Sequence, residues 1–189
     1  MSFFQMSSPA VARRMFLGRS GLVLSGAAVA LLAGNESLAA SAGPAGAGDV
    51  QILNTALGAE LEAVAAYQVG AESKLLEADV LKLALDFQGH HKEHAALLAR
   101  TVEKLGGKPV QPKSKYMFPV DQLKSQADVL RFAAGLEQGA VSAYLGAVPL
   151  FGDRNLAKAA ASILGDEAMH WAILRQAVGA VPVPGAFVS

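Results

Sequence analysis

The sequence contains no cysteine, and aromatic residues make up only 6% of it. Without thiols the chain cannot form a disulfide, a thiolate zinc site or an iron–sulfur cluster. It also cannot carry a rubredoxin-like electron donor of its own. Any metal must therefore be bound by oxygen and nitrogen atoms, which carboxylates and imidazoles supply.

The sequence also lacks a surplus of basic charge, with 16 Lys and Arg against 16 Asp and Glu. The N-terminal segment carries three of the arginines and one of the glutamates, and the rest of the chain has a net charge of −2. Proteins that bind nucleic acid concentrate Lys and Arg on one surface to contact phosphates. We therefore expect no nucleic acid partner.

The N-terminal residues have the pattern of a targeting segment. Arg13 and Arg14 are followed by an uncharged run over residues 21–34 and then by small residues. A basic region, an apolar stretch too short to span a bilayer and a small-residue cleavage site are typical of a secretory signal. We assign residues 1–42 to a signal peptide and residues 43–48 to a linker.

The arginine pair, with Phe16 and Leu17 behind it, resembles the twin-arginine export signal, although Ala12 and Gly18 replace the Ser and Lys often found there. The resemblance implies export to the periplasm or another extracytoplasmic space, by a route that carries folded proteins. Two alternatives stay open, namely an ordinary secretory signal that happens to contain two arginines and an uncleaved membrane anchor.

Beyond the signal, four segments have apolar residues at helical spacing and are separated by turn residues. A composition rich in Ala and Leu also favours helices. The predicted helices span residues 49–72, 78–105, 125–148 and 154–178. The sequence therefore predicts an all-α four-helix bundle over residues 49–179, followed by a tail over residues 180–189.

The ends of the predicted helices carry recognisable signals. We expect Asp49 to be the N-cap of the first helix, and Ser125 and Asp128 to form a capping box at the third. The connection over residues 109–120 is long for a hairpin between neighbouring helices. We therefore expect it to cross the bundle.

The two halves of the helical region resemble each other. Residues 60–67 match residues 137–144 at an offset of 77, and residues 89–94 match residues 165–170 at an offset of 76. Such self-similarity indicates a duplicated helix pair. Two pairs related in this way are expected to pack as a bundle with an approximate twofold axis.

Each predicted helix has one apolar stripe, and each stripe is interrupted at its middle by ionisable residues. These residues are Glu60, His91, His94, Glu137, Glu167 and His170. Buried carboxylates that repel one another are costly, and a cation converts the repulsion into ligand bonds. Residues three apart on a helix are neighbours, so the two members of each pair on the second and fourth helices can bind one ion together.

The competing interpretation of these six residues is structural. A lone buried histidine is usually satisfied by a hydrogen bond to a carbonyl or hydroxyl group, and a lone helical glutamate usually lies at the surface. Six such residues at matching depth on four helices favour a metal site instead. Two neighbours lie off the stripes: we expect Glu62 to be solvated and His90 to lie beside the ligands or at the surface.

The arrangement resembles the ferritin-like superfamily, whose two-metal sites use Glu, Glu-x-x-His, Glu and Glu-x-x-His on four successive helices. The residues at those positions are Glu60, His91 with His94, Glu137, and Glu167 with His170. Within the superfamily the chain looks similar to exported bacterial proteins related to the desiccation-related group, whose activities are poorly defined. The resemblance implies a cofactor of two metal ions, with iron as the first choice and manganese or zinc as alternatives.

The pattern departs once from the superfamily, because His91 stands where a bridging glutamate is usual. A neutral imidazole cannot bridge two ions, and it lowers the ligand charge from four negatives to three. A di-iron centre with a single carboxylate bridge from Glu167 and a bridging oxide or hydroxide therefore stays open, and so does a mononuclear site. Tyr67 and Tyr144 lie one heptad beyond the first glutamate of each half, where they either hydrogen-bond ligands, donate an electron or simply pack in the core.

The leading hypothesis is an exported metal protein that reacts with dioxygen or peroxide, as a peroxidase, a catalase-like enzyme or a ferroxidase. Its electrons have to come from an external donor, and no residue stands out as a separate acid or base. The alternatives are metal storage or sequestration in a homo-oligomeric shell, and a stress-related structural protein stabilised by a metal. Fold resemblance alone does not choose among these.

Overall fold

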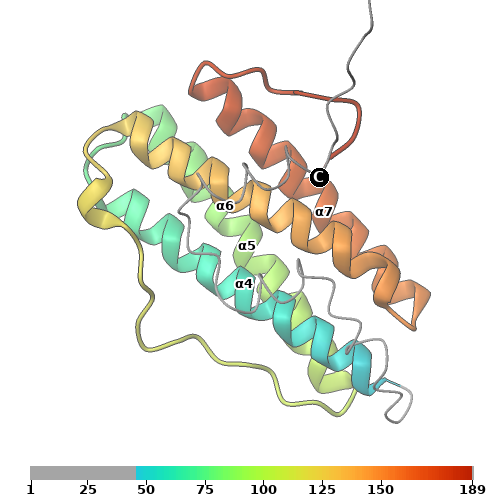
Figure 1. Ribbon diagram of the computed structural model, residues 1–189. Coiled ribbons are helices and arrows are strands. Elements are labelled where there is room, and N and C mark those ends of the chain that lie inside the picture. The colour runs from blue at the N-terminus through green and yellow to red at the C-terminus, as the bar shows by residue number, and fades with distance from the viewer. Residues whose placement is uncertain (1–45, 189) are drawn as a thin grey trace, which may run out of the picture.

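The computed structural model describes residues 46–188, so the predicted signal peptide lies outside the described residues. Within residues 46–188 the chain forms four α-helices, two short 3-10 helices and no strand, which confirms the predicted all-α bundle (Figure 1). The helices are α4 (Ala47–Glu72), α5 (Ala78–Lys104), η1 (Val120–Gln122), α6 (Gln126–Ala147), η2 (Val148–Leu150) and α7 (Arg154–Ala177). None of these helices is both long and apolar enough to cross a membrane.

The helices pack as two hairpins, α4 with α5 and α6 with α7. A short turn joins the members of each hairpin, whereas residues 105–125 link one hairpin to the other. Figure 1 shows this connection running the length of the bundle from the end of α5 to the start of α6. The predicted crossover is therefore confirmed, and it makes α5 run parallel to α6 and α4 parallel to α7 (Figure 1).

Most predicted helix ends agree with the structure. The hydroxyl of Ser125 accepts the N–H of Asp128 at 3.3 Å and donates to its carboxylate at 2.7 Å, which is the expected capping box at α6. At α7 the side chain of Asp153 caps the first turn. Gly106 and Gly179 follow α5 and α7 with φ values of +78° and +75°, a conformation that favours glycine.

The predicted role of Asp49 is wrong, because the N-cap of α4 is Gly46. Asp49 lies in the first turn instead and is only 8% exposed. Its carboxylate accepts backbone N–H bonds from Gly152 at 2.8 Å and from Asp153 at 3.1 Å. The side chain thus links the start of α4 to the turn before α7, a contact across the two hairpins.

Two apolar clusters fill the bundle, one on each side of its middle. The first contains Leu53, Leu57, Leu98, Val102, Tyr144 and Ile163, among others. The second contains Tyr67, Phe87, Leu130, Ala133 and Leu174. Burial of each large apolar side chain stabilises the fold by about 1.5–3 kcal/mol. Because the ionisable residues of the four stripes lie between these clusters along each helix, the clusters shield them from water.

Substitution of Asp49 by Ala is expected to lower the free energy of unfolding by about 1–3 kcal/mol, because two backbone N–H groups lose a charged acceptor. Urea unfolding followed by circular dichroism measures the change. Asp79→Ala is the matched control, since Asp79 is an exposed acidic residue in the first turn of α5. Equal losses for the two variants would mean that the contact across the hairpins contributes nothing.

Candidate metal centre

All six residues predicted from the stripes meet in the middle of the bundle. Glu60, Glu137, Glu167, His91 and His170 are at most 2% exposed. The side chain of His94 is 14% exposed and lies at the edge of the cluster. Ionised groups at this depth require compensation by opposite charge or by hydrogen bonds.

The six residues form two overlapping groups. One group is Glu60, His91, His94 and Glu167, and the other is His91, Glu137, Glu167 and His170. In each group the four ligand atoms lie within 4.8 Å of one another. Residues 91 and 167 belong to both groups, so the arrangement has the form of two adjacent cation sites that share two residues.

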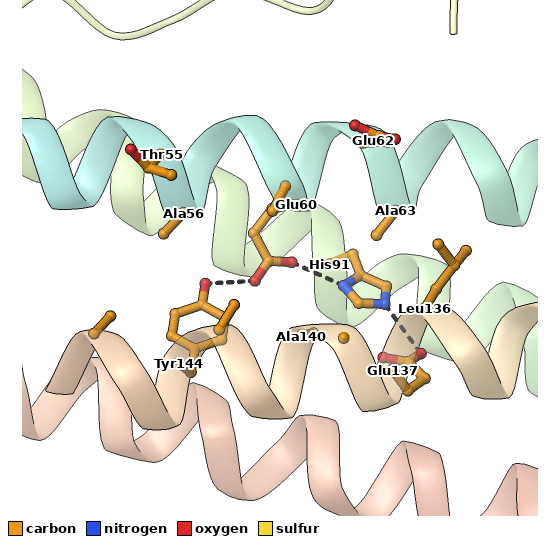
Figure 2. A pocket seen from close by; sticks show the side chains of 14 residues that line it. Thr55, Ala56, Glu60, Glu62, Ala63, His91, Leu136, Glu137, Ala140 and Tyr144 are labelled. Atoms are coloured by element: carbon orange, nitrogen blue, oxygen red, sulfur yellow. Dashed lines mark hydrogen bonds and ion pairs between the residues drawn. The ribbon is translucent and has the colours of Figure 1, made fainter. Parts of the chain in front are cut away.

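His91 lies between the carboxylates of α4 and α6 (Figure 2). Its Nδ1 is 2.8 Å from Oε2 of Glu60, and its Nε2 is 3.3 Å from Oε1 of Glu137. A neutral imidazole has one nitrogen with a free lone pair and one N–H. His91 can therefore ligate an ion in one group while its N–H donates to the carboxylate of the other group.

Several polar atoms in this cluster have no hydrogen-bond partner. They are both carboxylate oxygens of Glu167, Oε2 of Glu137, Nδ1 of His94 and Nδ1 of His170. Nδ1 of His94 lies 3.1 Å from Oε1 of Glu167, but not in hydrogen-bonding geometry. Oxygen and nitrogen lone pairs that converge without donors are what a cation needs, so these residues fit a metal ion.

The carboxylates shift the pKa values of the three imidazoles upward. Burial lowers the pKa of His91, but hydrogen bonds and charges from the surrounding carboxylates outweigh burial and raise it to about 11. The same opposing effects raise the pKa values of His94 and His170 to about 9. Burial raises the pKa of Glu137, yet contacts with two imidazoles hold it well below its usual range. Imidazolium groups thus balance the carboxylates when no metal is bound.

Two tyrosines complete the cluster with a crossed pattern. Tyr67 of α4 donates to Glu137 of α6, and Tyr144 of α6 donates to Glu60 of α4 at 2.6 Å. Burial and the adjacent carboxylates raise both tyrosine pKa values, so the phenols stay protonated donors. Each helix pair therefore orients a carboxylate of the other pair.

A second layer of polar contacts lies on the α5–α7 side. Oδ2 of Asp166 is 3.4 Å from Nε2 of His94 and 3.3 Å from Nε2 of His170, so it helps to hold both rings with Nδ1 toward the cluster. His90, predicted beside the ligands or at the surface, is about half exposed and lies 3.1 Å from Asp166. Nδ1 of His90 is also 2.9 Å from Nε2 of His170. All four histidines of the chain thus gather here.

Two residues near the cluster differ from the expectations based on the sequence: Asp166, which was given no role, and Glu62. Asp166 precedes Glu167 and matches His90 in the internal repeat, and that alignment was the available signal. The expectation that Glu62 is solvated is wrong, because its side chain is only 15% exposed. Nζ of Lys113, on the crossover connection, lies 3.6 Å from Oε2 of Glu62.

Comparisons with known proteins agree with this architecture. The chain matches the ferritin-like domain family over residues 48–180. A solved structure of similar fold is the conserved hypothetical protein rv2844 from Mycobacterium tuberculosis, with 23% sequence identity and a TM-score of 0.63. The match covers 72% of this chain and 94% of that one. No curated protein matched the sequence.

Replacing either tyrosine of the crossed pair should weaken metal binding by roughly 10–100-fold, because the carboxylate it orients becomes free to rotate. Chelator competition on Tyr67→Phe and Tyr144→Phe measures the dissociation constant. Tyr116→Phe is the control, since the Tyr116 hydroxyl bonds within the crossover connection. The three variants should fold alike. If Tyr116→Phe weakened metal binding as much as the other two variants, the role of Tyr67 and Tyr144 in orienting the carboxylates would be contradicted.

Metal loading at pH 7 should release protons, because His91, His94 and His170 have pKa values of about 9 or above in the metal-free protein and bind ions only when neutral. Affinity should therefore rise with pH through about 9, where His94 and His170 lose their protons, and on toward about 11, where His91 does. Zinc titration calorimetry in two buffers of different ionisation enthalpy counts the protons. An apparent enthalpy independent of buffer would show that the imidazoles are already neutral.

Proposed function

The chain belongs to the ferritin-like domain family, and from this premise we propose that its bundle holds a pair of iron or manganese ions that react with dioxygen or peroxide. The observation that carries the proposal is the pair of overlapping ligand groups, which share residues 91 and 167 and contain buried lone pairs without donors. When bound, such ions supply Lewis acidity and electron transfer to the site.

The residues divide between the two proposed ions in a simple way. Glu60 and His94 belong to one group only, and Glu137 and His170 to the other. Glu167 belongs to both groups and would be a ligand of either ion, since neither of its oxygens has a hydrogen-bond partner. The donor set of carboxylate and imidazole suits iron, manganese and zinc, and it contains no soft ligand that selects copper(I).

The rest of the chain holds these ligands and keeps bulk water away. The two tyrosine hydroxyls orient one carboxylate each, and Asp166 helps to orient two imidazoles. The apolar clusters on either side lower the local polarity, which strengthens every electrostatic interaction at the site. A preorganised, dry ligand set lets a redox ion react without competing side reactions.

Charge makes the two proposed ions unequal. Two divalent cations bring four positive charges, whereas the carboxylates supply three negative ones, because residue 91 is a histidine. The uncompensated charge weakens binding of the second ion in an interior of low polarity. His91→Glu adds the fourth carboxylate at the shared position and should strengthen binding of the second ion.

The proposal extends to location and partners. We place the protein in an extracytoplasmic compartment, on the strength of the arginine pair and apolar run in residues 1–42. Its electron donor is then a separate molecule, since the chain has no cysteine with which to build a redox centre of its own. Storage in a homo-oligomeric shell and a purely stabilising metal are the competing functions.

Elemental mass spectrometry of the purified protein tests the proposal. We expect about two iron or manganese ions per chain, and their loss in Glu167→Ala, which removes the carboxylate common to both groups. Glu93→Ala is the matched control, because Glu93 is an exposed glutamate of α5 that belongs to neither ligand group. This variant should keep the wild-type metal content. Mixing the loaded protein with dioxygen or peroxide should then oxidise the metal.

The outcomes separate the competing functions. About one ion per chain in the wild type and about two in His91→Glu would show that the histidine limits the site to one metal. Metal that stabilises the fold but never reacts with either oxidant would support the structural role. Absence of metal from the wild type would refute the metal centre altogether.

A further inference from the structure

A small cavity lies between α4 and α6 and reaches the candidate metal centre. Its volume is about 70 Å³. Figure 2 shows Glu60, His91, Glu137 and Tyr144 gathered at this cavity, where the two helices of different hairpins face each other. The cavity is therefore continuous with the ligands of both groups.

Small residues leave this space open. The facing walls carry Ala56, Ala59 and Ala63 on α4 and Gly139, Ala140 and Ala143 on α6. Their side chains are too short to fill the gap between the helices, and they offer no hydrogen bond to a guest. A wall of this kind favours an apolar guest over a polar one.

Besides the residues of the candidate metal centre, two polar residues line the cavity, Thr55 and Glu62. Thr55 already donates to the backbone of Gln51 at 2.9 Å. Oε2 of Glu62 lies 3.6 Å from Nζ of Lys113 and has no hydrogen-bond partner. In Figure 2 both lie farther from α6 than Ala56 and Ala63 do. They are therefore poorly placed to bind a guest inside the cavity.

The inner end of the cavity is different in character. Glu137 lines it, is 1% exposed, and has one oxygen, Oε2, without a hydrogen-bond partner. Both oxygens of Glu60 are occupied, one by Tyr144 and one by His91. A guest that passes the alanine walls therefore arrives directly at an unsatisfied metal-ligand oxygen.

Size and polarity together restrict the guest. Dry apolar cavities of about 150 Å³ hold benzene or xenon, so a cavity of about half that volume admits only a molecule of a few heavy atoms. Hydrogen peroxide loses its hydrogen bonds to water on entering such walls, whereas dioxygen loses none. Side chains that could hydrogen-bond peroxide on its way to the centre, His90 and Asp166, lie on the α5–α7 side of the bundle.

We propose that this cavity is the path by which dioxygen, rather than peroxide, reaches the candidate metal centre. The inference rests on the proposed function and selects one of its two oxidants. Residues 63 and 140, on opposite walls, control passage, because a longer side chain at either position fills the space between α4 and α6.

Xenon tests the cavity without any reaction. Alanine methyl spectra of the full chain in the presence of zinc, a diamagnetic ion, should shift under xenon pressure at Ala56, Ala63 and Ala140. The shifts should disappear in Ala63→Leu and in Ala140→Leu, which enter from opposite walls. Ala65→Leu is the matched control, since Ala65 is a half-buried alanine of α4 outside the cavity, and it should keep them.

The second measurement compares oxidants on the iron-loaded protein. Ala63→Leu should slow metal oxidation by dioxygen, leave oxidation by peroxide unchanged, and retain the wild-type iron content. Wild-type protein without xenon shifts in the cavity, or a leucine variant that slows both oxidants equally, would overturn the proposal. Xenon binding in a protein that binds no metal would instead refute the proposed function, so the two failures are distinguishable. Agreement of the two leucine variants guards against a folding defect in one.

Discussion

The structure depends on the mutual compensation of three carboxylates and three imidazoles buried in the middle of the bundle. Carboxylates at this depth, with 0–2% exposure, cannot remain ionised without positive charge beside them. Imidazolium groups supply that charge in the metal-free chain, and a metal supplies it when bound. Because the same lone pairs serve both states, metal binding and proton release are coupled. The apolar clusters above and below make the coupling strong by keeping water out.

The internal repeat explains why the compensation is balanced. At the 76-residue offset, His90 and His91 of α5 match Asp166 and Glu167 of α7. The structure brings each matched pair together, with His90 3.1 Å from Asp166 and His91 3.6 Å from Glu167. Two acids in one copy thus face two histidines in the other, where a strict repeat of acids would place like charges together. The chain therefore has one ligand carboxylate fewer, and opposite charges attract each other between the two hairpins.

The two faces of the centre differ in chemistry. On the α5–α7 side, a half-exposed histidine and an aspartate offer hydrogen bonds and charge. On the α4–α6 side, alanine and glycine walls lead to the ligands through an apolar space. The difference follows from the helix pairing, because only two of the four helices carry histidine. Ions and small apolar molecules therefore meet different surfaces of one site.

Residues that act within one helix were predictable from the sequence. Helical spacing places Glu60, His91, Glu137 and Glu167 on inward stripes, and short-range bonds set the cap at Ser125, so the four-helix bundle and its six central residues follow from periodicity alone. The signal peptide remains a prediction from the sequence.

Contacts between helices were decided only by the tertiary structure. The crossed tyrosine bonds, the bond from Asp49 to the turn before α7, the burial of Glu62 and the cavity at the α4–α6 contact join residues far apart in the sequence. Helical periodicity states which side of a helix faces inward, but not which residue of a neighbouring helix lies opposite. That choice depends on the axial offset between helices, which is set by the crossover connection and the packing of the whole core.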